Sequence, residues 1–248
     1  MEYADKTEKL RAMIEQSENI VFFGGAGVST ESDIPDFRSE GGLYSQQYKY
    51  PPEFMLSHTF YASHADEFFD FYRNKILCPR AKPNEAHRVL HRLEEQGKLK
   101  AVITQNIDGL HQAAGSKNVL ELHGSVHRNY CVNCGRFYPL HYILGTEEIP
   151  RCECGGVVKP DVVLYEEGLD PDTLEKAARF IKEADLLIVG GTSLVVYPAA
   201  GLLQEYRGGK LVLINKGTTP YDNEAALVIG AKVGETLGKA WPSGQKEG

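Results

Sequence analysis

Six short segments of the chain consist almost entirely of apolar residues, and each is four or five residues long. The lack of alternation between apolar and polar positions is typical of strands that are buried on both faces of a parallel sheet. We therefore predict strands at 19–23, 101–104, 119–122, 186–189 and 211–214, and a sixth, with a weaker pattern, at 226–229.

Apolar residues recur at helical spacing between several of these segments. Near the N-terminus, Leu10, Met13 and Ile14 fall on one helical face. The pattern predicts helices at 5–17, 84–96, 172–184 and 197–206. Strands that alternate with helices in this way predict an α/β fold, in which helices cover both faces of a mostly parallel sheet.

Two stretches interrupt the alternation. Residues 40–83 are rich in aromatic residues and are expected to form loops and short helices, and residues 128–159 contain four of the five cysteines. We expect these two insertions to form a small domain beside the sheet. The large domain would then consist of residues 1–39, 84–127 and 160–241, and residues 242–248 would form a flexible tail.

Charge and length narrow the class of protein. The chain has 248 residues and a net charge of −7, which suits one large domain with a small insertion. The acidic balance argues against direct binding to nucleic acid, which requires clustered Lys and Arg. The charged start of the chain and the lack of a long apolar run predict a cytoplasmic protein with no membrane partner, in which cysteines stay reduced.

The four clustered cysteines form two pairs. Two residues separate Cys131 from Cys134, and one residue separates Cys152 from Cys154. Two such pairs resemble a zinc ribbon, in which four thiolates hold a structural zinc ion and leave no open position for water. The single spacer in the second pair departs from the usual knuckle, so reduced cysteines without metal are the alternative.

The first predicted strand runs directly into a glycine turn, Gly24-Gly-Ala-Gly27, as phosphate-binding loops of α/β proteins do. Thr30 occupies the third glycine position of the usual dinucleotide fingerprint, so an ordinary tight turn is the alternative. A dehydrogenase would continue with a strand that ends in an acidic residue. Here the chain continues with Pro35-Asp-Phe-Arg38, so a dinucleotide would be held differently.

At this point the sequence resembles the sirtuin family. Short motifs occur in the order found in sirtuins over about residues 8–235, and they are Gly25-Ala-Gly27-Val-Ser29, Pro35-Asp-Phe-Arg38, Gln105-Asn-Ile-Asp108, His123-Gly124, the paired cysteines and Gly191-Thr-Ser193. The resemblance implies a Rossmann-like domain, and a small domain made of a zinc ribbon and a helical insertion. It also implies that NAD and an acyl-lysine protein or peptide meet in the cleft between them.

The resemblance further implies a chemistry in which NAD is a reactant and not a hydride carrier. The acyl oxygen of the modified lysine attacks the ribose carbon as nicotinamide leaves, and the products are free lysine, nicotinamide and O-acyl-ADP-ribose. His123 matches the general base, a role that suits histidine because its pKa lies near neutrality. Asn106 matches the residue that holds the ribose and positions water, while Asp108 and Ile107 match those that hold the carboxamide.

Further positions match the family's ligand contacts. Phe37 matches an aromatic residue that shields the ribose, and Arg38 matches a residue near the phosphates. The residues implied in binding NAD are Gly25, Ala26, Gly27, Ser29, Thr30, Phe37, Arg38, Gln105, Asn106, Ile107, Asp108, Gly191, Thr192, Ser193, Asn215, Lys232 and Val233. The acyl-lysine peptide would meet His123 and would pair, as an added strand, with Val162, Val163, Leu164 and Tyr165.

Two departures from the family bear on specificity. Tyr165-Glu-Glu167 stands where many relatives have Phe-Gly-Glu, and Glu166 is expected to alter peptide contacts or to favour basic residues beside the lysine. Relatives that prefer succinyl or malonyl groups have Tyr and Arg three residues apart, whereas this chain has Tyr72-x-x-Lys75. Lysine is a poorer bidentate partner for a carboxylate, so we expect neutral acyl groups, acetyl first.

Three other functions were weighed against this one. A dehydrogenase is disfavoured by the missing acidic residue after the glycine turn. A zinc-ribbon adaptor without enzymatic activity would leave His123, Asn106 and Asp108 unexplained. A protein ADP-ribosyltransferase is separated from a deacylase only by analysis of the products.

Overall fold

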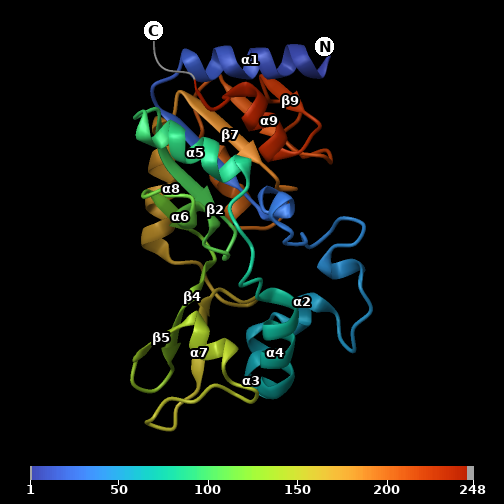
Figure 1. Cartoon of the computed structure of the whole chain (residues 1–248), viewed down its shortest axis with the longest axis vertical. Helices are drawn as coiled ribbons and strands as arrows, with labels where there is room; N and C mark the ends of the chain where they lie inside the picture. Colours follow the sequence, from blue (N-terminus) through green and yellow to red (C-terminus); the bar gives the residue numbers. More distant parts are fainter. Residues whose placement is uncertain (1, 245–248) are drawn as a thin grey trace.

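The computed structural model describes residues 2–244 and contains a six-stranded parallel sheet in the order β3-β2-β1-β7-β8-β9 (Figure 1). This order is that of a Rossmann sheet, whose two halves meet here at β1 and β7. All six predicted strands belong to it: β1 (Ile20–Gly24), β2 (Leu99–Thr104), β3 (Val119–Glu121), β7 (Leu186–Gly190), β8 (Leu211–Ile214) and β9 (Leu227–Ile229). The predicted fold class is confirmed.

Helices cover both faces of the sheet because alternate strand residues point to opposite faces. Ile20 and Phe22 of β1 belong to a core shared with α1 (Tyr3–Glu15), α5 (Glu85–Glu95) and α9 (Val233–Ala240). Val21 and Phe23 belong to a second core, shared with α8 (Pro171–Glu183) and the 3₁₀ helix η5 (Ala199–Glu205). The continuous apolar strands of the sequence are therefore buried on both sides.

One of the expected helices differs in type. The segment predicted as a helix at 197–206 is the 3₁₀ helix η5, and Pro198 before it and Gly201 within it both disfavour a regular α-helix. After β1 the chain forms two short 3₁₀ turns, η1 (Ala26–Val28) and η2 (Thr30–Ser32), in place of the long helix of a dehydrogenase. The first glycine turn is therefore followed by a loop.

The two insertions share a third apolar core, in which Phe60, Phe68 and Phe69 pack with Ile143 and Val158. The first contains η3 (Leu43–Ser45), α2 (Pro52–Met55), α3 (His58–Ser63), α4 (Ala65–Phe71) and the π-helix η4 (Tyr72–Ile76). The second contains α7 (Leu140–Leu144) and an antiparallel sheet of β5 (Phe137–Pro139), β4 (Gly124–Cys131) and β6 (Val158–Val162). Because β4 and β6 cross the expected boundaries at 127 and 160, the division into domains stays a prediction.

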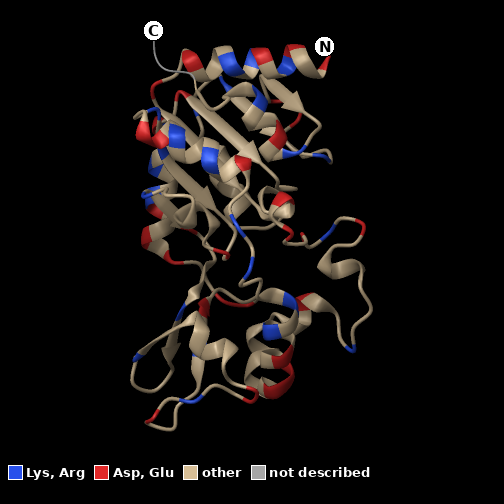
Figure 2. Cartoon of the chain, viewed as in Figure 1, with Lys and Arg blue, Asp and Glu red and all other residues tan. Residues whose placement is uncertain are grey.

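The outer surface carries charges of both signs. Acidic and basic residues alternate along α1 at one end of the molecule, and the helices of the first insertion carry both as well (Figure 2). Within residues 2–244, no helix is both long enough and apolar enough to cross a bilayer. The predicted flexible tail falls largely on residues 245–248, which lie outside the described part of the chain.

The four paired cysteines converge at the outer end of the small sheet. Their sulfur atoms all lie within 4.8 Å of one another, with Cys131 Sγ 3.4 Å from Cys154 Sγ and Cys134 Sγ 3.6 Å from Cys152 Sγ. Zinc with four Zn–S bonds of about 2.3 Å in a tetrahedron needs sulfur atoms about 3.8 Å apart. The single spacer of the second pair is accommodated by Gly155, whose φ of +85° favours glycine. The group is able to hold a structural zinc ion.

Two neutral histidines are buried under the large sheet. His87 on α5 and His111 on α6 (Leu110–Ala113) are 0% and 1% exposed, and their ring centroids lie 4.7 Å apart. Burial lowers the pKa of His87 to about 4 and that of His111 to about 3. Neither ring nitrogen of His111 has a hydrogen-bond partner among the described residues, so nothing there stabilises an added proton.

Metal removal should unfold the small sheet. We expect the purified protein to contain close to one zinc ion per chain by elemental analysis, and Cys152→Ser to lose the zinc and melt at a lower temperature. Cys78→Ser is the matched control, because Cys78 lies outside the cluster. A folded wild-type protein without zinc would refute the assignment.

Acidification should destabilise the protein through the two histidines. Their unfolded pKa is near 6.5, so below that pH the unfolded chain binds protons that the folded chain does not, and the free energy of unfolding falls. The expected loss is about 2 kcal/mol per histidine between pH 7.5 and pH 5. Urea unfolding at both pH values measures it. His111→Phe should show a smaller loss than the wild type, and the exposed His141→Gln the same loss; an equal loss in all three would contradict the mechanism.

Candidate active site

Two glycine turns meet at the carboxyl ends of β1 and β7, where the halves of the sheet join. The amide of Gly25 donates to the carbonyl of Gly190 at 3.1 Å, and that of Gly27 to Gly191 at 2.8 Å. A Cβ on Gly27 would lie 2.7 Å from the Cα of Gly191, whose own φ is +61°. Only glycine fits this approach, and it leaves the strand ends open to a ligand, as expected at a topological switch point.

A single cavity of about 1020 Å³ opens at this point and extends toward the small sheet. Every residue that the resemblance implied in binding NAD or the peptide lines it. The four cysteines do not. The predicted site residues, which come from segments far apart in the sequence, are therefore brought together in one place.

Three polar side chains form a connected network in the floor of the cavity. Ser29, which is 1% exposed, donates its hydroxyl hydrogen to Asp108 Oδ2 at 2.6 Å, and Asn106 Nδ2 donates to Ser29 Oγ at 3.1 Å. The amide of Leu110 donates to the other Asp108 oxygen at 2.9 Å. Burial raises the pKa of Asp108, and the bonds from Ser29 and Leu110 oppose that shift. Asp108 is therefore partly buried, and both of its carboxylate oxygens accept hydrogen bonds.

The hydroxyl groups of the glycine turn are used within the protein. The Ser29 hydroxyl serves Asp108, and Thr30 Oγ1 donates to the carbonyl of Gly27 at 3.0 Å. Both hydroxyl hydrogens are therefore donated within the protein in this structure. Backbone amides and Arg38 are the donors of this region that remain for a phosphate.

His123 follows β3 and is held by one hydrogen bond, from Nδ1 to the carbonyl of Gln105 at 2.9 Å. A carbonyl can only accept, so the proton lies on Nδ1 and the lone pair of the neutral ring lies on Nε2. Burial lowers the pKa of His123, and the bond to Gln105 raises it by less. The ring is thus neutral at pH 7, with Nε2 free of hydrogen-bond partners within residues 2–244.

The chain turns sharply after His123. Gly124 has a φ of +76°, and a Cβ there would lie 2.0 Å from the carbonyl oxygen of Asp161. The amide of Val163 donates to the carbonyl of His123 at 3.0 Å. The end of β6 is therefore bonded directly to the residue that carries the imidazole.

The segment expected to pair with a peptide lines the cavity, and its side chains alternate between buried and more exposed positions. Val162 and Leu164 are buried in the core of the small sheet, whereas Val163 is partly exposed. Glu166 has a φ of +75°, a conformation that suits the glycine of many relatives. Its carboxylate accepts hydrogen bonds from Thr59 N and Thr59 Oγ1 at 2.9 and 2.7 Å. The carboxylate thus binds α3, which weakens the expectation that it selects basic residues beside the lysine.

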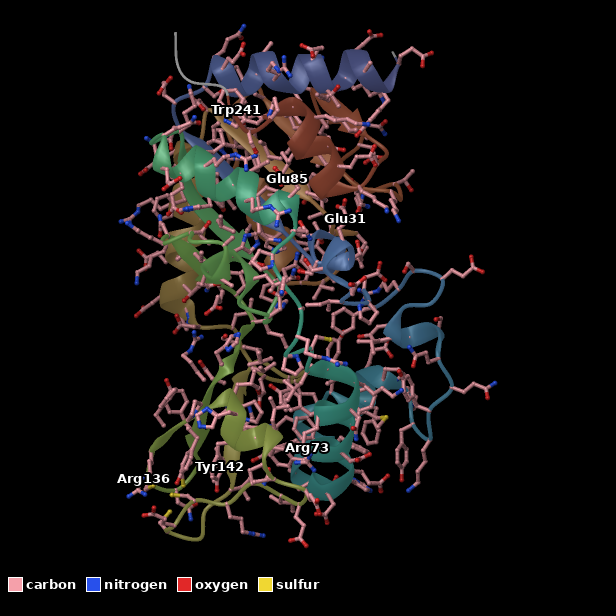
Figure 3. The ribbon with its side chains drawn as sticks, viewed as in Figure 1. Glu31, Arg73, Glu85, Arg136, Tyr142 and Trp241 are labelled. Carbon is pink, nitrogen blue, oxygen red and sulfur yellow. The ribbon has the colours of Figure 1, made fainter. Side chains whose placement is uncertain are left out.

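The far end of the cavity is closed by α9. Lys232 and Val233 begin this helix, and the carboxylate of Glu31 accepts hydrogen bonds from the amides of Gly234 and Glu235 at 2.7 and 3.2 Å (Figure 3). Glu31 therefore ties the first glycine loop to the helix and occupies its first-turn amides. This contact, 203 residues apart in the sequence, was not predicted.

Several cavity residues were missed by sequence reasoning. They have no motif of their own, and they include Ile34, Val196 and Lys216 in loops and Val126 in β4. The apolar run Leu194-Val-Val-Tyr197, directly after a site motif, is the signal that could have identified Val196.

Comparison with known proteins agrees with the fold. Residues 25–198 match the model of the Sir2 family. The chain is 62% identical over 237 residues to an NAD-dependent protein deacetylase of Clostridium acetobutylicum, covering 94% of this chain and 97% of that protein. It is 44% identical over 240 residues to one of Sulfolobus acidocaldarius, covering 94% and 93%.

Solved structures show the same likeness. A Sir2 structure with a deacetylated p53 peptide and 3'-O-acetyl-ADP-ribose has a TM-score of 0.86 at 40% identity, covering 96% of this chain and 98% of that one. A Sir2 structure with a p53 peptide and NAD+ has a TM-score of 0.81 at 42% identity, covering 94% and 95%. The predicted family is confirmed, and the chain belongs to the Sir2 family.

Proposed function

We propose that this protein removes acyl groups, acetyl first, from lysine side chains of proteins in an NAD-dependent reaction. The observation that carries the proposal is the neutral imidazole of His123, which lines the same cavity as every predicted NAD contact and has no hydrogen-bond partner at Nε2 within residues 2–244. The relatives named NAD-dependent protein deacetylases, at up to 62% identity among those compared, support it. NAD, when bound, supplies a ribose carbon that exchanges nicotinamide for the acyl oxygen.

We assign to each side chain of the site the part that the resemblance to the family implies. His123 accepts a proton at Nε2 from a ribose hydroxyl, and the bond from Nδ1 to Gln105 keeps the ring in the tautomer that can do so. Asp108 and Ile107 hold the carboxamide, and Asn106, fixed by Ser29, orients the ribose and water. Phe37 excludes water from the ribose once nicotinamide has left.

The helical insertion supports a preference for neutral acyl groups. Arg73 is turned away from the cavity, because its guanidinium donates to the carbonyls of Glu147 and Glu148 at 2.6 and 2.9 Å (Figure 3). Tyr72 and Lys75 line the cavity, and the Tyr72 hydroxyl is buried with no partner among the described residues. An acyl carboxylate would meet lysine there and no bidentate arginine.

We also propose a cytoplasmic location. Four thiols that hold a metal must stay reduced, and reducing conditions are those of the cytoplasm.

The activity is tested by mass spectrometry of an acetyl-lysine peptide incubated with and without NAD. We expect acetyl loss only with NAD, together with nicotinamide and O-acetyl-ADP-ribose. His123→Gln should lower the rate by about 10²–10⁴-fold, because it removes the base, and His141→Gln should not. Since burial lowers the pKa of His123, the acid limb of kcat/KM should lie below pH 6.5. ADP-ribose attached to protein, with no free O-acetyl-ADP-ribose, would favour the ADP-ribosyltransferase instead.

The acyl preference is tested with acetyl and succinyl forms of one peptide. We expect a kcat/KM at least about tenfold higher for acetyl, because a succinyl carboxylate would be poorly compensated in the cavity. Lys75→Arg should lower the ratio of the acetyl to the succinyl kcat/KM, because arginine offers the succinyl carboxylate a bidentate partner. Lys82→Arg, at a position outside the cavity, should leave this ratio unchanged. Faster removal of succinyl by the wild type would overturn the preference.

A further inference from the structure

Residues 35–48 leave the body of the protein as a long loop and carry two of the predicted cofactor contacts, Phe37 and Arg38 (Figure 1). The loop is held together by its own hydrogen bonds, such as those from Leu43 N to Asp36 O and from Tyr44 N to Phe37 O, at 2.9 and 2.8 Å. Within residues 2–244, one hydrogen bond leaves the loop, between the hydroxyl groups of Tyr44 and Tyr165, at 2.7 Å. Apolar packing also holds the loop, through the buried Leu43 and the contact of Tyr48 with Phe71. The hydroxyl pair is therefore the polar tether of the loop among the described residues.

Tyr44 also supports both cofactor contacts from behind. Its ring meets that of Phe37 edge to face, with centroids 5.5 Å apart, and Arg38 Cζ lies 5.5 Å from the centroid of the same ring. A displacement of Tyr44 would move the aromatic group expected to shield the ribose and the guanidinium expected near the phosphates.

Tyr165, by contrast, is fixed in a rigid segment. Its amide donates to the carbonyl of Leu56, and its carbonyl accepts from the amide of His58, both at 3.0 Å. The next residue, Glu166, is held by Thr59 through two hydrogen bonds, and Glu167 Oε1 lies 2.9 Å from His58 Nδ1. The segment 163–167, on the peptide side of the cavity, is thus anchored to the start of α3.

We propose that the two hydroxyl groups of Tyr44 and Tyr165 form a clasp that joins the cofactor side of the cavity to the peptide side. Both are positioning residues. Tyr165 holds the hydroxyl group of Tyr44 in place, and the ring of Tyr44 in turn holds Phe37 and Arg38. Each hydroxyl then affects the ligand bound by the other loop. The phenylalanine that many relatives have at the position of Tyr165 lacks the oxygen, so the clasp is a feature of chains with tyrosine there. This inference rests on the proposed function for the identity of the two ligands.

The clasp is tested with Tyr44→Phe, Tyr165→Phe and the double variant, each of which removes only hydroxyl oxygen. Calorimetry with ADP-ribose probes the cofactor side, and an acetyl-lysine peptide probes the other. Tyr165→Phe should weaken ADP-ribose binding, and Tyr44→Phe should weaken peptide binding, each about two- to tenfold, the effect of one hydrogen bond. For either ligand, the double variant should bind no more weakly than the single variants, because both remove one shared interaction.

Tyr3→Phe is the matched control, because it removes a hydroxyl contact with Thr236, at 3.2 Å, in residues that do not line the cavity. It should leave both affinities unchanged, and thermal unfolding of every variant separates loss of folding from loss of the clasp. Effects confined to the ligand of the mutated loop, or losses that add in the double variant, would overturn the clasp. A wild type that binds both ligands but releases no acetyl group would instead refute the proposed function and leave the clasp standing.

Discussion

The contact between the two glycine turns is the constraint on which the site depends. Gly27 and Gly191 bring two backbone segments closer than any side chain would allow, at the point where the halves of the sheet separate. The amides that cross there join β1 to β7 beyond their last paired residues. Because the turns are locked together, the residues that follow them, including Ser29 and Thr192, have fixed positions at the carboxyl ends of the strands. Gln105 Nε2 then bonds Thr192 Oγ1 at 3.1 Å, which adds the end of β2 to the same frame.

Polar groups buried in this frame are of two kinds. Those in the cavity floor have hydrogen-bond partners. Asp108 accepts hydrogen bonds from Ser29 and from the amide of Leu110, and His123 donates one to the carbonyl of Gln105. The pairing fixes which atoms carry protons, so that His123 presents a lone pair and Asn106 an oriented amide. His87, by contrast, accepts one hydrogen bond, from the amide of Asn84, and His111 has no hydrogen-bond partner among the described residues. The cost of burying them appears as sensitivity of the fold to acid, whereas the cost of burying His123 is offset by a bond that sets its chemistry.

The sequence predicted the parts of this structure that depend on local patterns. Strands buried on both faces are predicted from continuous apolar runs, and the first glycine turn is predicted from the glycines that directly follow a strand. The prediction of an α-helix at 197–206 was wrong in type. Apolar spacing does not distinguish an α-helix from the 3₁₀ helix that Pro198 and Gly201 favour. Contacts made by side chains across long distances had no local signal. Two contacts are of this kind: the one between the Glu31 carboxylate and the first amides of α9, and the one between the hydroxyl groups of Tyr44 and Tyr165. Only the folded chain brings the partners of each contact together.

The small sheet connects the metal centre to the catalytic cavity. Strand β4 begins at Gly124, directly after His123, and ends at Cys131, and its partner β6 runs from Val158, opposite Cys131, to Val162, opposite Gly124. Each strand therefore has one end at the cysteine cluster and the other at the cavity wall. A zinc ion with four thiolates has no open position and takes no part in the chemistry. By holding the outer ends of both strands in register, however, it fixes the inner ends, where Val163 meets His123 and the peptide side of the cavity begins.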